Sequence, residues 1–148
     1  MNKKIFLIVL SFIFIFAGCD PYGVKKWVIY TKKRVRVDPN NPLTVLKDGY
    51  RATRVYEFQG KRVVDWAWTI TVRNESNEDI IFDVEYILQT KGPVNLVADS
   101  NLGLTIKPEE TKAIYKDAAW NLALDKFRSI TGGNWKISQR NLLPWETD

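Results

Sequence analysis

The sequence contains no histidine and only one cysteine among its 148 residues. Histidine is the commonest metal ligand and general base, and cysteine is the usual thiol nucleophile, so most familiar hydrolase mechanisms are excluded. A single cysteine also cannot form an internal disulfide, so the fold must rest on packing, for which six Trp, seven Phe and six Tyr are present. We therefore expect a protein that is not an enzyme and has no cofactor and no metal site.

Only one long hydrophobic run is present, and it lies near the start of the chain. Two lysines precede an apolar run at residues 5–16, and the small residues Ala17 and Gly18 follow it. The run is about a dozen residues long, whereas a transmembrane helix needs about 20. A positive start, a short apolar run and small residues at its end are the pattern of an export signal. We predict that residues 1–18 are a signal peptide.

The single cysteine follows this pattern directly. The segment Phe16-Ala17-Gly18-Cys19 resembles the lipobox of bacterial lipoproteins. The resemblance implies that the chain is cut before Cys19, that the thiol receives a diacylglyceryl group, and that the new amino terminus often receives a further acyl chain such as palmitate. Two or three acyl chains hold a protein stably on a bilayer, at about 0.8 kcal/mol per buried methylene. The alternative is a plain signal peptide with a chance cysteine at the cut.

The next residue bears on which membrane holds the protein. In enterobacterial-type sorting, aspartate directly after the lipidated cysteine marks retention on the periplasmic face of the inner membrane, and Asp20 fits that rule. The resemblance thus implies a lipid-anchored, extracytoplasmic protein of the cell membrane, facing the periplasm if the organism is Gram-negative. Residues 19–23 would form the lipidated anchor and a short tether. Nucleic acid is not an expected partner of an exported lipoprotein.

Positive charge is concentrated beside this anchor. In residues 20–37 six basic residues stand against one acidic residue, whereas residues 38–148 hold 14 basic and 16 acidic residues. Near an anionic surface each Lys or Arg adds about 1 kcal/mol to membrane binding. Membrane or anion contact is therefore one prediction for Lys25, Lys26, Lys32, Lys33, Arg34 and Arg36. The alternative is a solvated strand face, because the two arginines alternate with valines.

Residues 24–148 have the pattern of one β-sandwich domain. Apolar and polar residues alternate along residues 62–73 and again along residues 82–89, as half-buried strands require. The inward sets are Trp66, Trp68, Ile70 and Val72 in the first run and Phe82, Val84, Tyr86 and Leu88 in the second. Further strands are expected at 24–37, 50–58, 94–98, 102–107, 111–118 and 134–140, with a short helix at 122–130. We predict an all-β, immunoglobulin-like antiparallel β-sandwich of about seven to eight strands with one short helix.

Part of this pattern also points to a family. The stretch DWAWTITVRNESNEDIIFDVEYILQTKG at residues 65–92 is followed by LTIKPEETKAI at residues 104–114. Its strand ending in an Asn-containing turn, second strand reaching a Gly turn, and proline turn before another strand resemble the FxLYD-type domains of bacterial exported proteins. The resemblance implies an immunoglobulin-like sandwich that serves as a binding or accessory module.

Four tryptophans lie outside the two alternating runs, namely Trp27, Trp120, Trp135 and Trp145. An exposed indole stacks on a sugar ring or anchors a protein interface, where Trp is enriched among hot spots. The leading interpretation is a membrane-anchored lipoprotein of the cell envelope that acts by contact with an envelope protein partner, as a non-catalytic interaction or accessory module. The alternative is a lipoprotein that binds glycan or peptidoglycan fragments through exposed Trp or Tyr side chains, with these four tryptophans as the stacking candidates.

Overall fold

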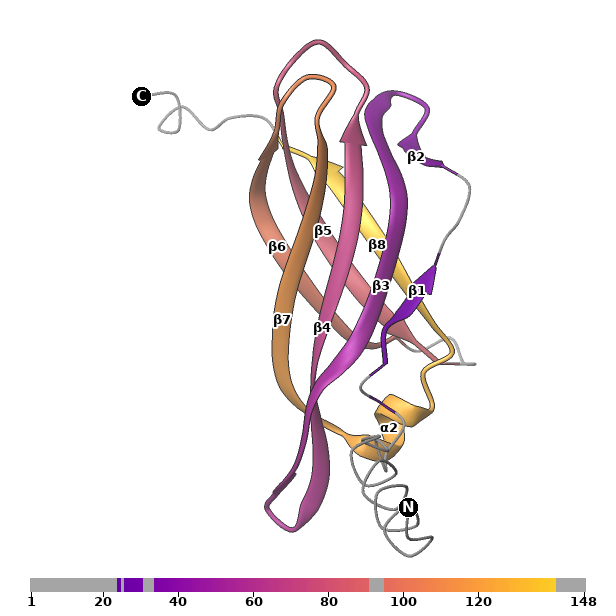
Figure 1. Ribbon diagram of the computed structural model, residues 1–148, viewed down its shortest axis with the longest axis vertical. Coiled ribbons are helices and arrows are strands. Elements are labelled where there is room, and N and C mark those ends of the chain that lie inside the picture. Colours follow the sequence, from indigo (N-terminus) through magenta and orange to yellow (C-terminus); the bar gives the residue numbers. More distant parts are fainter. Residues whose placement is uncertain (1–23, 25, 31–33, 91–94, 141–148) are drawn as a thin grey trace, which may run out of the picture.

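The computed structural model describes residues 24, 26–30, 34–90 and 95–140, which form two antiparallel sheets packed face to face (Figure 1). One sheet contains β1 (Val28–Tyr30), β2 (Val35–Asp38), β3 (Asn41–Phe58), β4 (Lys61–Asn74) and β7 (Thr111–Ala123). The other contains β5 (Ile80–Gln89), β6 (Asn95–Ile106) and β8 (Gly132–Gln139), and one short helix, α2 (Leu124–Arg128), precedes β8. The predicted all-β sandwich with one short helix is confirmed.

The order of the strands follows the immunoglobulin arrangement. In that fold strands A, B and E are neighbours in one sheet, and strands C and F are neighbours in the other. Here β3, β4 and β7 take the places of A, B and E, while β5 and β8 take the places of C and F. β6 pairs with the free edge of β5, where variable-type domains carry strand C′. The chain therefore crosses between the sheets three times, after β4, β6 and β7.

The core lies between the sheets and is built from the two alternating runs. Both predicted inward sets are fully buried, so the facing of β4 and β5 is as the sequence indicates. At the centre the Trp68 and Tyr86 rings stack with centroids 5.5 Å apart and an interplanar angle of 4°. The Trp68 indole N–H donates to Asp99 Oδ2 at 2.7 Å, and the Tyr86 hydroxyl donates to Asp48 Oδ2 at 2.9 Å. Aromatic packing and these hydrogen bonds join the two sheets.

The start of the domain differs from the prediction. The single strand expected at residues 24–37 is two short strands, β1 and β2, that pair with different parts of β3. The turn after β2 is limited to Pro39 and Asn40, and the chain returns at Asn41 as one strand of 18 residues, whereas a strand at residues 50–58 was expected. The expectation was wrong because the polar Asp48 has its partner in Tyr86 of the other sheet, which local sequence does not reveal.

Two other boundaries were also predicted wrongly. The strands expected at residues 94–98 and 102–107 are one strand, β6, with a register shift where Gly103 adopts a φ of 65° and its N–H donates to Asp83 Oδ1 at 2.7 Å. A glycine at positive φ in a bulge bends a strand without ending it. β7 continues to Ala123, so the helix expected at residues 122–130 is the five-residue α2, which buries Leu124 and Phe127.

Candidate functional site on the outer face of the five-stranded sheet

An aromatic cluster lies on the outer face of the five-stranded sheet. Ala67 of β4 faces outward between Arg51 of β3 and Asp117 of β7, yet it is fully buried, so other side chains cover the sheet at this point. Trp27, just before β1, lies against Tyr115 of β7, with ring centroids 6.2 Å apart and planes at 68°. The Trp27 indole is thus brought from one edge of the sheet to the strand at the other edge.

An arginine completes this cluster. The Arg51 guanidinium carbon lies 4.8 Å from the centroid of the Trp27 ring, a distance typical of cation–π contacts. The Tyr115 hydroxyl donates to Asp117 Oδ1 at 2.6 Å, and this hydrogen bond, together with burial, raises the pKa of Tyr115 above its ordinary value. Tyr115 nevertheless remains 48% exposed. The cluster therefore exposes to solvent the ring of Tyr115, which the hydrogen bond to Asp117 holds in place near the guanidinium of Arg51.

A second aromatic–arginine pair lies further along the same face. The Arg54 guanidinium carbon is 4.5 Å from the centroid of the Tyr56 ring. The Tyr56 hydroxyl contacts Asn121 and donates to Asp65 Oδ1 at 3.0 Å. Desolvation and the hydrogen bond to Asp65 raise the pKa of Tyr56. We call the five residues Trp27, Arg51, Arg54, Tyr56 and Tyr115 the aromatic face.

Trp, Tyr and Arg are the residues most enriched among interface hot spots, because they offer large contact areas and a polar group. On the aromatic face the cation–π contacts and tyrosine hydrogen bonds already hold these side chains in place, which lowers the entropy lost when a partner binds. Two arginines alternate with two carboxylates, Asp65 and Asp117, across the same surface. Such a surface suits a partner that carries both aromatic and charged groups.

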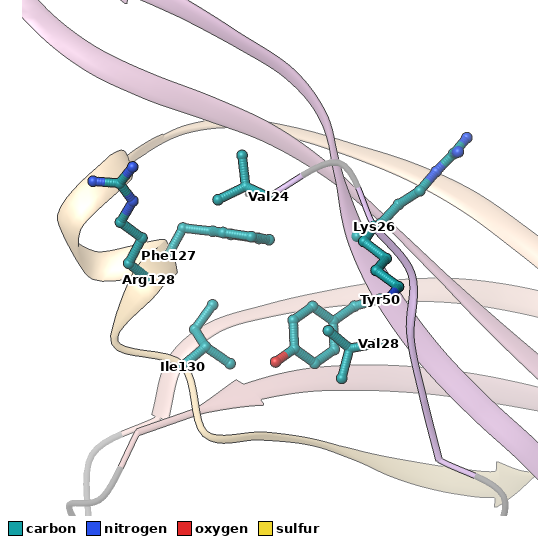
Figure 2. A pocket seen from close by; sticks show the side chains of 8 residues that line it. Val24, Lys26, Val28, Tyr50, Phe127, Arg128 and Ile130 are labelled. Carbon is teal, nitrogen blue, oxygen red and sulfur yellow. The ribbon is translucent and has the colours of Figure 1, made fainter. Parts of the chain in front are cut away.

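A small cavity lies beside this face, between α2 and the first strands. Its volume is about 210 Å³, and Val24, Lys26, Val28, Tyr50, Arg51, Phe127, Arg128 and Ile130 line it. Figure 2 shows apolar side chains such as Phe127 and Ile130 beside the basic side chain of Arg128, which points outward from α2. Burial, and then the hydrogen bond with Tyr30, raise the pKa of Tyr50, so its hydroxyl stays neutral. The cavity is smaller than the 300 Å³ or more of typical ligand pockets, so the aromatic face is the stronger candidate.

The structure separates the basic residues that the sequence groups together. Lys26 is exposed beside the cavity, whereas Arg34 and Arg36 lie on or next to β2, which pairs with β3 at Val45. The start of the described chain lies elsewhere on β3, because the Val24 carbonyl accepts a hydrogen bond from the N–H of Ala52. Ala52 is seven residues from Val45 along the strand, which is a distance of about 23 Å. Arg34 instead lies 3.4 Å from Glu75 at the far end of the molecule. This placement favours the solvated-strand interpretation for both arginines; Lys25, Lys32 and Lys33 lie outside the described residues.

The four tryptophans do not form one platform either. Trp27 belongs to the aromatic face, whereas Trp135 of β8 stands opposite Tyr86 and packs against the core. Trp145, like Cys19 and Asp20, lies outside the described residues, and the side chain of Trp120 is not described. The other four members of the aromatic face, Arg51, Arg54, Tyr56 and Tyr115, were not predicted as site residues. Alternation along β7 places Tyr115 outward, but only the fold brings Trp27 to it.

Within the described ranges, no three His, Cys, Asp or Glu side chains come together as ligands for a metal ion. Among the same residues, no helix has the length and apolar character needed to cross a membrane. No family model, curated protein or solved structure matches the chain.

Proposed function

We propose that this protein is a lipid-anchored, non-catalytic interaction module of the cell envelope, held on the membrane through Cys19 and binding a protein partner through the aromatic face. The lipobox-like segment Phe16-Ala17-Gly18-Cys19 supports the anchor. The single observation that carries the interaction is the Trp27, Arg51 and Tyr115 cluster, in which a tryptophan, an arginine and a half-exposed tyrosine are held together on one face.

The same cluster favours protein contact over sugar stacking. A sugar stacks on an open ring face, but the guanidinium of Arg51 already lies over the Trp27 ring at 4.8 Å. Tyr115 meets that indole at 68°, so the two rings do not form a flat platform. The flanking charges of both signs match a protein surface, since complementary charges fix the register of an interface and exclude wrong partners.

The short tether supports the location of the interaction. Val24 is already buried in the core, so only residues 20–23 separate the anchored cysteine from the folded domain. Five residue steps span at most about 18 Å when fully extended. The aromatic face is therefore kept beside the membrane, and its partner would be a membrane protein or another envelope protein held close to the bilayer.

Site-specific photocrosslinking in cells tests the interaction. A photoreactive residue at Ala113, which is exposed on the outer face of β7 two residues from Tyr115, should crosslink to one partner. The same residue at Ser138, exposed on β8 of the other sheet, is the matched control and should not.

Tyr115→Ala should lower the affinity for the partner about thirtyfold, since a hot spot contributes about 2 kcal/mol or more. The yield of the crosslink from position 113 should fall accordingly. Leu102→Ala removes an even more exposed side chain, 68% exposed, from the other sheet and should leave the crosslink unchanged. Equal crosslinking from positions 113 and 138, or no effect of Tyr115→Ala, would contradict the proposal. Adducts that disappear on digestion of peptidoglycan would instead identify a glycan ligand.

A further inference from the structure

The hairpin of β3 and β4 extends beyond the sandwich. The pairing of β4 with β7 ends at Val63 and Ala123. Beyond that point, among the described residues, Glu57 and Phe58 of β3 pair only with Arg62 and Lys61 of β4. Gln59 and Gly60 close the hairpin with φ values of 50° and 72°, as a two-residue type I′ turn requires. A rigid two-stranded finger therefore projects from one end of the domain (Figure 1).

The tip of this finger is amphipathic. All residues from 57 to 62 are exposed, and Phe58 is 43% exposed although it is a large apolar side chain. Phe58 pairs directly with Lys61, and Arg62 follows it on the same strand. Aromatic rings and basic side chains together are the residues that bind at the interface of an anionic bilayer.

The tip also lies at the end of the molecule where the chain leaves for its anchor. Figure 1 shows the tip, α2 and the first described residues at the same end. The Ala52 N–H donates a hydrogen bond to the Val24 carbonyl at 3.1 Å, so Ala52 marks where the start of the described chain joins β3. Phe58 is six residues further along β3, at a distance of about 20 Å from Ala52. The tether from Cys19 to Val24 spans at most about 18 Å. The distance from Ala52 to the tip is therefore at least as great as the maximal length of the tether, so the tip can reach the surface that holds the lipid.

Basic residues outnumber acidic ones both in the tip, where Lys61 and Arg62 stand against Glu57, and in its surroundings. Lys126 and Arg128 of α2 are exposed, as is Lys26 beside the cavity, whereas Asp125 is the one acidic residue of that helix. Basic side chains within a Debye length of about 8 Å from an anionic bilayer are attracted to it at physiological ionic strength. The charge of this end therefore complements anionic phospholipid.

We propose that the hairpin tip, residues 57–62, rests on the lipid bilayer, with Phe58 in the headgroup region and Lys61 against anionic phospholipid headgroups. This inference rests on the lipid anchor of the proposed function. Contact at the anchor and at the tip fixes two points of the domain, so the long strands stand away from the membrane. The aromatic face is then roughly perpendicular to the membrane plane, so it is directed toward neighbouring proteins in the same membrane.

Fluorescence of the full, processed chain in vesicles of phosphatidylethanolamine and phosphatidylglycerol tests the contact. Glu57→Cys places a fluorophore at the tip, and Glu78→Cys, an identical change in the exposed turn before β5, places it at the opposite end. A lipidated Cys19 cannot react, so each variant carries one label. We expect spin-labelled lipid headgroups to quench the label at 57 and aqueous iodide to quench the label at 78.

Within the Glu57→Cys chain, Lys61→Gln should lower the equilibrium constant for tip contact about fivefold, which corresponds to about 1 kcal/mol per basic residue near an anionic surface. Phe58→Ser should also reduce the lipid quenching, and so should replacing phosphatidylglycerol by phosphatidylcholine. Lys136→Gln, which neutralises an exposed lysine on β8 of the other sheet, should leave it unchanged.

The outcomes separate the tip from the anchor. If Cys19 carries lipid but the labels at 57 and 78 are equally exposed to iodide, the tip contact is wrong and the proposed anchor stands. If Cys19 remains reactive, the proposed anchor fails. In that case the tip contact survives only if added anionic vesicles still quench the label at 57 and not the label at 78, and it is overturned otherwise.

Discussion

Two adjacent glycines in β8 should respond in opposite ways to the same substitution. A Cβ added to Gly133 would overlap the hydroxyl of Tyr86 and lie 2.8 Å from its Cζ, closer than real Cβ contacts. A Cβ added to Gly132 would lie 3.8 Å from the hydroxyl of Tyr30, an ordinary contact. We expect Gly133→Ala to destabilise the domain and Gly132→Ala to leave its stability unchanged or raise it.

The cost at Gly133 follows from what holds Tyr86 in place. Its ring stacks on Trp68 and its hydroxyl donates to the buried Asp48, so it cannot move without losing one of these contacts. Overpacking costs about 1–3 kcal/mol and an unmade buried hydrogen bond about 1–3 kcal/mol. Against a total stability of about 5–15 kcal/mol, Gly133→Ala should lose about 2–5 kcal/mol, or about 10–20 °C in Tm. Gly132→Ala should gain up to about 1 kcal/mol, because it lowers the entropy of the unfolded chain.

Thermal and urea unfolding of the two variants measures this difference. Tyr86→Phe provides the internal check, because removing the hydroxyl removes the closest overlap with the new methyl group. Gly133→Ala should therefore cost less in the Tyr86→Phe background than in the original chain, a coupling that a double-mutant cycle detects. Equal Tm values for Gly132→Ala and Gly133→Ala would refute the packing of β8 against Tyr86.

Phe82→Ala should cost about 3–5 kcal/mol because Phe82 is fully buried, whereas Asp83→Ala, which loses one exposed hydrogen bond to Gly103, should cost about 1 kcal/mol or less in urea unfolding. Alkaline pH should also unfold the protein. Burial, with the hydrogen bonds to Tyr30 and Asp48, raises the pKa of Tyr50 and Tyr86 above 10.0, so the unfolded chain loses these protons first. Stability should be complete below pH 10 and fall above it by about 1.4 kcal/mol per tyrosine per pH unit, and Tyr86→Phe should flatten that slope.

The sequence predicts the sandwich where one side of a strand is buried and the other is solvated. β4 and β5 meet that condition, and a slip of one residue would expose their whole apolar sets, so their facing could be read from alternation alone. β3 was predicted only in part because polar Asp48 and flexible Gly49 interrupt its pattern. Both residues are present because of tertiary contacts. Asp48 accepts a hydrogen bond from Tyr86, and Gly49 lies so close to β1 that a Cβ would clash with Ile29.

The candidate surfaces could be predicted from the sequence less well than the fold. An exposed aromatic residue has the same local pattern whether it stands alone or in a cluster, and Trp27 meets Arg51 and Tyr115 only because three strands place them together. Charge counting along the chain placed Arg34 and Arg36 beside the anchor, but the structure carries them to the other end. The hairpin of β3 and β4 and the helix α2, which lie at the end of the molecule where the described chain begins, carry the basic residues Lys61 and Lys126, and both are distant in sequence from residues 20–37.

The intact mass of the mature protein extracted from membranes is the decisive test of the proposed lipid anchor at Cys19. We expect a chain that starts at Cys19 and carries a diacylglyceryl group, with or without an additional acyl chain on its amino terminus. Cys19→Ala should then give an unprocessed precursor or a protein released from the membrane. A wild-type chain that carries no lipid and starts at another residue would rule out the lipid anchor.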